Sequence, residues 1–285
     1  MTFTEPNPPQ LPAVRLGRIR FINVDPIYYG LEHQNCPDDI RIESASPADL
    51  NRMMADGLLD ISSVSSAAYG THHKEWLLLP DLSIACTGDV MSVILVARMP
   101  LANLDRQRVL ISEDSATAAA LTKLMFAHSG VSPRLEVKKV HSPSQIDPDA
   151  AAALVIGDAS MRYKWHQHFE FVWDLGDLWA KHAKLPFVFA VWAVRKEFAA
   201  EHPARVSLMI DLLRESKRTG LKHLDTVVKI SSEKLNIDPD ITRRYFENFR
   251  YDFGPYEKLG LAAFFKDLYA TGISKDNAQI TFFPQ

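Results

Sequence analysis

The sequence predicts an α/β fold of two lobes, with mixed sheets flanked by helices. At 285 residues the chain is longer than a typical single domain. Short apolar segments alternate with helical patterns, and apolar spacing of three to four residues then continues toward the C-terminus. We expect residues 1–97 and 195–285 to form lobe 1 and residues 98–194 to form lobe 2. The chain would cross near 97–101 and 190–195, and two crossover strands make a hinge that lets lobes close over a ligand.

Composition excludes several classes of function. The chain is 47% hydrophobic and 24% charged with a net charge of −3, and its charges are interspersed, so no footprint for nucleic acid or anionic membrane is present. The first 13 residues have neither a basic nor an apolar signal region, and no run of about 18 apolar residues occurs. We therefore expect a cytoplasmic protein. The sequence carries no signal for its oligomeric state.

The two cysteines predict neither a disulfide nor a zinc site. Cys36 and Cys86 are far apart and lack CxxC spacing. Cys86 lies in an apolar segment and is expected to be a small buried side chain.

The first ordered element is a strand over residues 14–22. The Pro-rich start, through Pro12, predicts a loose arm, and apolar alternation begins at Val14. Asn23 stands at the strand's exit, and loops at the carboxyl ends of strands are where α/β proteins usually bind ligands.

The next unit is a capped helix followed by a strand. Ser46-Pro47 is typical of a helix start, and Gly57 of its end. The apolar segment Leu58–Val64 predicts a strand that leads into a small polar cluster. We include Ser65 and Ser66 of this cluster among the substrate-binding residues. Two further strands are expected at Leu77–Ala85 and Ser92–Ala97, with a turn at residues 87–89 between them.

A strand, a hydroxyl-rich loop and a helix follow one another from Val109. The strand VLIS leads to Ser115, Ala116 and Thr117, and then to a helix that Gly130 could end. The first turn of a helix has free N–H groups and a partial positive charge, so this order suits an oxyanion. Ordinary helix capping by Ser115 or Thr117 explains the same pattern.

The remaining elements alternate once more and then become helical. Ala151–Ile156 predicts a strand that places Asp158 just past its end. Leu185–Val194 is apolar on both faces, as a central parallel strand would be. After it the chain is expected to be helical to its end.

The spacing of the histidines and the tryptophans does not support a metal site or a base-stacking surface. His72 and His73 are adjacent, and His166 and His168 are two apart, which places each pair on different helix faces and disfavours zinc. No HExxH, GxSxG, P-loop or GxGxxG motif occurs. The tryptophans at 165, 173, 179 and 192 lack a basic stripe, so core packing is preferred over base stacking. We expect no metal and no cofactor.

Several separated blocks resemble the chorismate dehydratases of menaquinone biosynthesis. The chain opens with GRIRFINVDPIYYGL, and it continues with SPADLNRMMADGLLDISSVSSAAY, GDVMSV, the Ser115 and Thr117 helix start, a strand ending in IGD, and LWAKHAKLPFVFAVW. These blocks cover residues 15–195 in one order. Ala118 departs from the pattern, since a serine often follows the threonine in this family.

The resemblance implies a type II periplasmic-binding-protein-like fold with a two-strand hinge, used for catalysis. It implies removal of water from chorismate to give 3-[(1-carboxyvinyl)oxy]benzoate in the futalosine route. Catalytic roles would fall to Asn23 and Ser92, which position the enolpyruvyl ether and the departing hydroxyl, and carboxylate binding to Ser115, Ala116 and Thr117. Asp158 would contact the substrate or, equally, orient a neighbouring loop, and the base would be either Asp158 or the substrate's own carboxylate, which we favour.

Two rival functions share this fold. A sister enzyme that makes dihydroxynaphthoate has a serine- and cysteine-bearing start where this chain has FINVDP, so the dehydratase ranks first. A non-catalytic protein that binds a small carboxylate solute is the alternative outside enzymes.

Overall fold

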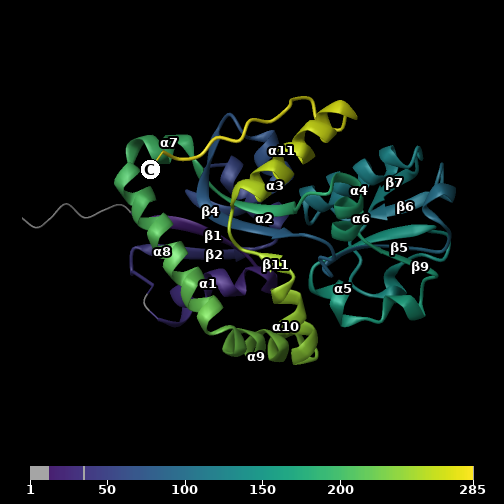
Figure 1. The fold of residues 1–285 in the computed structure, drawn as a ribbon, viewed down its shortest axis with the longest axis horizontal. Coiled ribbons are helices and arrows are strands. Elements are labelled where there is room, and N and C mark those ends of the chain that lie inside the picture. Colours follow the sequence, from purple (N-terminus) through teal and green to yellow (C-terminus); the bar gives the residue numbers. More distant parts are fainter. Residues whose placement is uncertain (1–12, 35, 285) are drawn as a thin grey trace, which may run out of the picture.

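The computed structural model describes residues 13–34 and 36–284, so the arm predicted through Pro12 lies outside the described residues. Within them the strands form two sheets, each with its own helices (Figure 1). The six-stranded sheet has the order β11-β4-β10-β3-β1-β2, and the five-stranded sheet has the order β7-β6-β8-β5-β9. The predicted two-lobed α/β architecture is confirmed.

The strand bounds show which segments build each sheet. The six-stranded sheet contains β1 (Val14–Ile19), β2 (Ile40–Ala45), β3 (Ile61–Ser65), β4 (Trp76–Cys86), β10 (Phe187–Arg195) and β11 (Phe249–Arg250). The five-stranded sheet contains β5 (Val93–Ala97), β6 (Arg108–Ile111), β7 (Arg134–Val137), β8 (Ala152–Ile156) and β9 (Phe171–Asp174). Four of these, β2, β7, β9 and β11, were not predicted, because each is short and none is fully buried.

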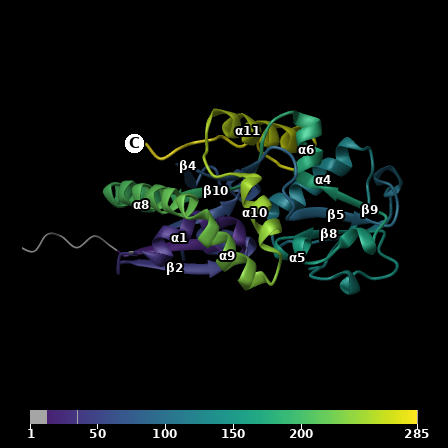
Figure 2. The same ribbon diagram turned by 60° about the horizontal axis from the view of Figure 1, so that its bottom comes forward.

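Helices cover both sheets. Those nearest the six-stranded sheet are α1 (Asp25–His33), α2 (Pro47–Ala55), α3 (Ser66–Thr71), α7 (Lys196–Glu201), α8 (Pro203–Lys222), α9 (Leu224–Leu235), α10 (Pro239–Glu247) and α11 (Pro255–Ala270). The five-stranded sheet carries α4 (Ala116–His128), α5 (Asp158–Arg162) and α6 (Leu175–Ala183). Helices α9 and α10 extend from α8 toward the second sheet (Figure 2). Single 3-10 turns are η1 (Ile22–Val24), η2 (Leu101–Asn103), η3 (Pro143–Gln145) and η4 (Trp165–Gln167).

Capping residues predicted the starts of several helices correctly. The Ser46 hydroxyl caps α2 by accepting from Asp49 N at 3.2 Å, with Pro47 as the first helical residue. Ser115 caps α4, as predicted, by accepting from Ala118 N at 3.3 Å. Caps depend on neighbouring residues alone, which is why the sequence reveals them.

The prediction that Leu185–Val194 forms a central parallel strand is wrong in its direction. Strand β10 does lie inside the sheet and is buried over most of its length, but it is antiparallel to both β3 and β4. A strand buried on both faces has a continuous apolar sequence whichever way its neighbours run. Its direction is set by where the chain comes back from the second lobe.

The crossovers between lobes differ from the predicted limits at residues 97 and 195. Strand β5 belongs to the five-stranded sheet and β10 to the six-stranded sheet, so the chain crosses between Cys86 and Val93 and returns after α6, before Phe187. Asp174 links the first crossover to the start of α6, because its carboxylate accepts from Val90 N at 2.9 Å and from Met91 N at 2.6 Å while capping α6.

The C-terminal segment also corrects an expectation. The chain is helical after β10 only as far as α11, and residues 271–284 then return along the sheet, where Leu78 and Phe282 form a parallel bridge. Among the described residues, no helix combines the length and the apolarity that crossing a bilayer requires.

The core explains most of the tryptophans. Trp165, Trp179 and Trp192 are buried, which confirms packing roles for them, whereas Trp173 is half-buried and stacks on Phe171. Trp192 Nε1 donates to the Tyr28 hydroxyl, which donates to the carbonyl of Gly17. The polar atoms of Tyr28 and Trp192 are thus paired inside the first lobe.

Candidate functional site

A pocket lies where the strand-end loops of the two lobes meet. Its walls come from the exits of β1 and β3, the start of β5, the end of β8, the cap of α4, and β10, α10 and β11. The lining residues are Ile19, Phe21, Asn23, Pro47, Ser65, Ile84, Val90, Ser92, Val93, Ser115, Ile156, Gly157, Phe189, Ala190, Tyr245 and Phe249. Four of the sequence-predicted residues, Asn23, Ser65, Ser92 and Ser115, are therefore neighbours in space.

The pocket is narrow in this conformation. It offers about 40 Å³ to water, which is room for about three water molecules. Pockets that hold small organic ligands usually measure ~300–1,000 Å³. A ring-sized ligand therefore does not fit the pocket in this conformation.

The turn after β1 presents Asn23 to the pocket. Residues 22–24 form the 3-10 turn η1, and Asp25 anchors it by accepting from the Arg18 guanidinium and the Ser231 hydroxyl, both at 2.7 Å. The Asn23 Oδ1 atom is buried and has no hydrogen-bond partner among the described residues. Because a buried amide oxygen without a partner is costly, this atom is suited to receive a hydrogen bond from a ligand.

Gly157 allows the second lobe to approach this turn. Its φ is +73°, and a Cβ at this position would come within 2.6 Å of the Phe21 ring. Gly157 N donates to the Ser92 carbonyl at 2.7 Å, which joins the start of β5 to the end of β8. Ser92, itself 5% exposed, is thereby held beside the turn that carries Asn23.

The two remaining serines of the pocket sit at helix starts. The Ser65 hydroxyl accepts from Asn51 Nδ2 at 3.1 Å and caps α3. Ser115 caps α4, whose first-turn N–H groups lack intrahelical partners and carry a partial positive charge. An anionic group in the pocket next to Ser115 gains from this helix end.

Three predicted substrate-binding residues do not reach the pocket. The Ser66 hydroxyl donates to the Val188 carbonyl at 2.6 Å, and Thr117 Oγ1 accepts from Ala67 N at 2.9 Å. Ala116 lines a different hollow, between α3, α4 and α11. Ser66 and Thr117 instead hold the starts of α3 and α4 in place, because neighbouring residues at a helix start point in different directions.

Asp158 lies behind the pocket wall. It follows Gly157 at the start of α5 and is absent from the lining, and its Oδ1 atom is buried without a hydrogen-bond partner among the described residues. Burial, and then the negative charge of Asp25, raise the pKa of Asp158 to about 6, and the Ile22 amide only partly offsets this.

Tyr245 is the main pocket residue that sequence reasoning missed. Its hydroxyl is buried and makes no hydrogen bond of good geometry among the described residues, although the Ser92 side chain lies close enough to lower its pKa in part. Burial dominates and raises this pKa well above the ordinary value. Tyr245 fits the apolar spacing of α10, and this spacing by itself predicts only a packed helix. Phe189 and Phe249 were missed for the same reason: nothing local distinguishes a pocket wall from a core contact.

Within the described lining, Tyr245 is the one residue with an ionisable side chain, and its raised pKa keeps it neutral at pH 7. The pocket thus combines hydroxyls, an amide, a helix start and aromatic walls. Such a site holds an anionic ring by hydrogen bonds and packing, without supplying a strong base of its own.

Comparison with known proteins agrees with this picture. The model of a family described as menaquinone biosynthesis matches residues 14–270. The chain is 35% identical over 266 residues to a chorismate dehydratase from Thermus thermophilus, covering 87% of this chain and 93% of that protein.

Solved structures share the fold at low identity. Protein AF1704 from Archaeoglobus fulgidus superposes with a TM-score of 0.73 at 18% identity, covering 92% of this chain and 98% of that one. The periplasmic aliphatic sulphonate binding protein SsuA from Escherichia coli has a TM-score of 0.65 at 12% identity, covering 97% and 95%. The expected periplasmic-binding-protein-like fold is confirmed.

Proposed function

The chain belongs to the menaquinone biosynthesis family, and we infer that it is a chorismate dehydratase, a carbon–oxygen lyase that converts chorismate to 3-[(1-carboxyvinyl)oxy]benzoate and water. The observation that carries this inference is the pocket between the lobes. It gathers Asn23, Ser92 and Ser115 around aromatic walls and leaves buried polar atoms ready for a ligand.

We propose that the lobes separate to admit the substrate, whose functional groups then match those of the lining. Chorismate has a six-membered ring, which packs against Phe189 and Phe249, and two carboxylates. One carboxylate is placed at the start of α4, beside Ser115 and the first-turn N–H groups. These groups replace the arginine that is often used for carboxylates, since the described lining contains no cationic side chain.

The chemistry requires orientation and charge handling. A proton leaves C3 and hydroxide leaves C4, so that the ring becomes aromatic and one water is released. The C3 proton is acidified through the ring alkene conjugated with the C1 carboxylate. Donors that fix this carboxylate stabilise the developing dienolate, which is the role we propose for Ser115 and the helix start.

We propose that the substrate's own enolpyruvyl carboxylate accepts the C3 proton. Two observations support this choice over Asp158: the described lining offers no carboxylate or imidazole, and Asp158 stands behind Gly157. The protein then contributes geometry, with Asn23 and Ser92 holding the enolpyruvyl ether and the departing hydroxyl. Tyr245, as a neutral phenol, is placed to donate a hydrogen bond to the leaving oxygen.

The test is turnover. When purified protein is added to chorismate, the absorbance of chorismate should fall and the benzoate product should appear, with no added metal or cofactor. Binding without turnover would instead indicate a solute-binding protein. Turnover of cyclic dehypoxanthine futalosine in place of chorismate would indicate the dihydroxynaphthoate-forming sister.

Ser92→Ala tests the site map within this function. We expect kcat/KM to fall about 10-fold to 100-fold, because a positioned hydroxyl beside the reacting atoms is lost. Ser207→Ala, on the exposed surface of α8, is the matched control and should retain the wild-type rate. Equal rates for both variants would remove Ser92 from the mechanism.

A further inference from the structure

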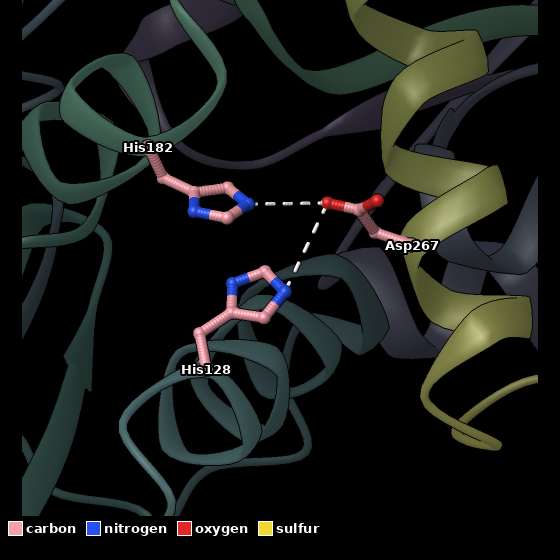
Figure 3. Close-up of side chains that lie close together, drawn as sticks. All are labelled: His128, His182 and Asp267. Carbon is pink, nitrogen blue, oxygen red and sulfur yellow. Dashed lines mark ion pairs between the residues drawn. The ribbon is translucent and has the colours of Figure 1, made fainter.

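Three side chains from three helices converge outside the proposed active site. His128 ends α4, His182 lies in the last turn of α6, and Asp267 lies in the last turns of α11 (Figure 3). The two imidazole rings are stacked, with centroids 3.9 Å apart. Both Nε2 atoms are directed at the same carboxylate atom, Asp267 Oδ2, at 3.9 Å from His128 and 3.4 Å from His182.

These distances are too long for hydrogen bonds and suit a shared ion. Hydrogen bonds from nitrogen to oxygen measure ~2.7–3.2 Å. A zinc ion bound to nitrogen and oxygen at ~2.0–2.2 Å in tetrahedral geometry holds its ligand atoms about 3.4 Å apart. The ligand atoms of the three residues lie within 4.8 Å of one another, so small side-chain shifts complete the geometry.

The three side chains are partly open to solvent. The side chains are 25% exposed for His128, 43% for His182 and 29% for Asp267, so an ion can reach them from solvent.

We propose that His128, His182 and Asp267 form a binding site for a divalent transition-metal ion, with Zn²⁺ as the best match and a fourth position open to water. The site is independent of the proposed function. Sequence spacing could not reveal it, because the three residues are far apart in the chain and only the fold brings their helices together.

An ion at this site would connect the two lobes. Helices α4 and α6 accompany the five-stranded sheet, whereas α11 packs on β10 of the other lobe. His182 also lies just before the return crossover. A bound ion therefore ties the lobes together beside the hinge and resists the separation that the narrow pocket requires for ligand exchange.

Calorimetric titration of the full chain with Zn²⁺ tests the site. We expect one equivalent to bind, and the affinity to fall at least about tenfold in His182→Ala and in Asp267→Ala. His166→Ala combined with His168→Ala is the matched control and should bind like the wild type. Co²⁺ should give the visible absorption of a tetrahedral site in the wild type and lose it in both site variants.

Thermal unfolding provides a second readout. Saturating Zn²⁺ should raise Tm of the wild type by about 5 °C and leave the Tm of His182→Ala unchanged. Circular dichroism of the metal-free variants controls for folding, and His182→Gln, which keeps the side chain's bulk, should behave like His182→Ala. Absence of binding to the wild type, or one-equivalent binding that survives both His182→Ala and Asp267→Ala, would overturn the proposal. An unchanged wild-type Tm would show that the ion does not bind the folded protein in preference to the unfolded chain, which would also overturn the proposal.

Discussion

Two buried aspartates, one before a strand start and one after a strand end, differ in their hydrogen-bond partners and in the direction of their pKa shifts. Asp60, just before β3, accepts from Arg15 N at 2.9 Å, from Arg15 Nε at 3.0 Å and from the Arg195 guanidinium at 3.2 Å. Burial alone would raise the pKa of Asp60, but its hydrogen bonds and the charge of Arg15 lower it below the ordinary value. Asp158, just after β8, has an unpaired oxygen and a pKa raised to about 6.

The comparison indicates that the strand starts belong to the scaffold and that the strand ends face the ligand. At the strand starts the buried charge is fully paired, which favours stability. At the strand ends Asn23 Oδ1, Asp158 Oδ1 and the Tyr245 hydroxyl remain without partners, each at a cost of ~1–3 kcal/mol. A ligand can pair with Asn23 and Tyr245, which line the pocket, whereas Asp158 lies behind its wall, so the comparison predicts opposite outcomes for substitutions at the two edges.

Asp60→Ala should have the largest effect and should act on stability alone. Removing one partner of a buried ion pair costs ~3–5 kcal/mol, and we expect about 3 kcal/mol because the Arg15 side chain is 40% exposed. Urea unfolding measures the loss, and turnover per folded molecule should not change. Asp225→Ala, which removes an exposed partner of Arg243, is the control and should cost less than ~1 kcal/mol. Similar losses in the two variants would break the comparison.

Asn23→Ala should act in the opposite way. We expect kcat/KM for chorismate to fall about 100-fold, equivalent to ~2.7 kcal/mol, with the free energy of unfolding unchanged or slightly increased. Asn103→Ala, exposed at the end of η2, should keep the full rate. A stability loss in Asn23→Ala without a rate loss would reassign this residue to the scaffold.

Asp158→Asn should stabilise the protein at neutral pH. The pKa of Asp158 is raised in the folded state, so its stabilising contribution is complete below pH ~4 and declines as the pH rises to about 6. The amide removes that decline, for a gain of about 2 kcal/mol at pH 7 and none at pH 4. Urea unfolding at both pH values measures it. Turnover should remain within about fivefold, whereas a fall of ~100-fold or more would make Asp158 the base.

Tyr245→Phe should have a small effect on both the rate and the stability. Losing the hydroxyl should lower kcat/KM about fivefold, equivalent to ~1 kcal/mol, and raise the free energy of unfolding by about the same amount. Tyr251→Phe is a close control, since the Tyr251 hydroxyl is also buried without a partner among the described residues but lies outside the pocket. It should gain stability at the full rate. A rate loss in both would show that packing, not the pocket hydroxyl, controls turnover.

The candidate site was predictable where it follows from strand ends. Asn23 and Ser92 stand at the end or the start of an apolar strand, and the fold brings such positions to one edge. The hydroxyls of Ser66 and Thr117 are predicted to bind the ligand because they share those loops. In the structure, Ser66 donates to the carbonyl of Val188 on the adjacent strand, and Thr117 accepts from the backbone of Ala67 in the other lobe. Position along the chain identifies the loop but not the direction of each side chain.

By itself the sequence determined the alternation of strands and helices, the capped starts of α2 and α4, and the family, because these depend on adjacent residues and on periodicity. Only the tertiary structure decided the direction of β10, the crossovers at residues 87–92 and 184–186, the place of Tyr245 in the pocket, and the meeting of His128, His182 and Asp267. These arise from packing between segments remote in the chain, and a local pattern of residues carries no record of which remote surface it will face.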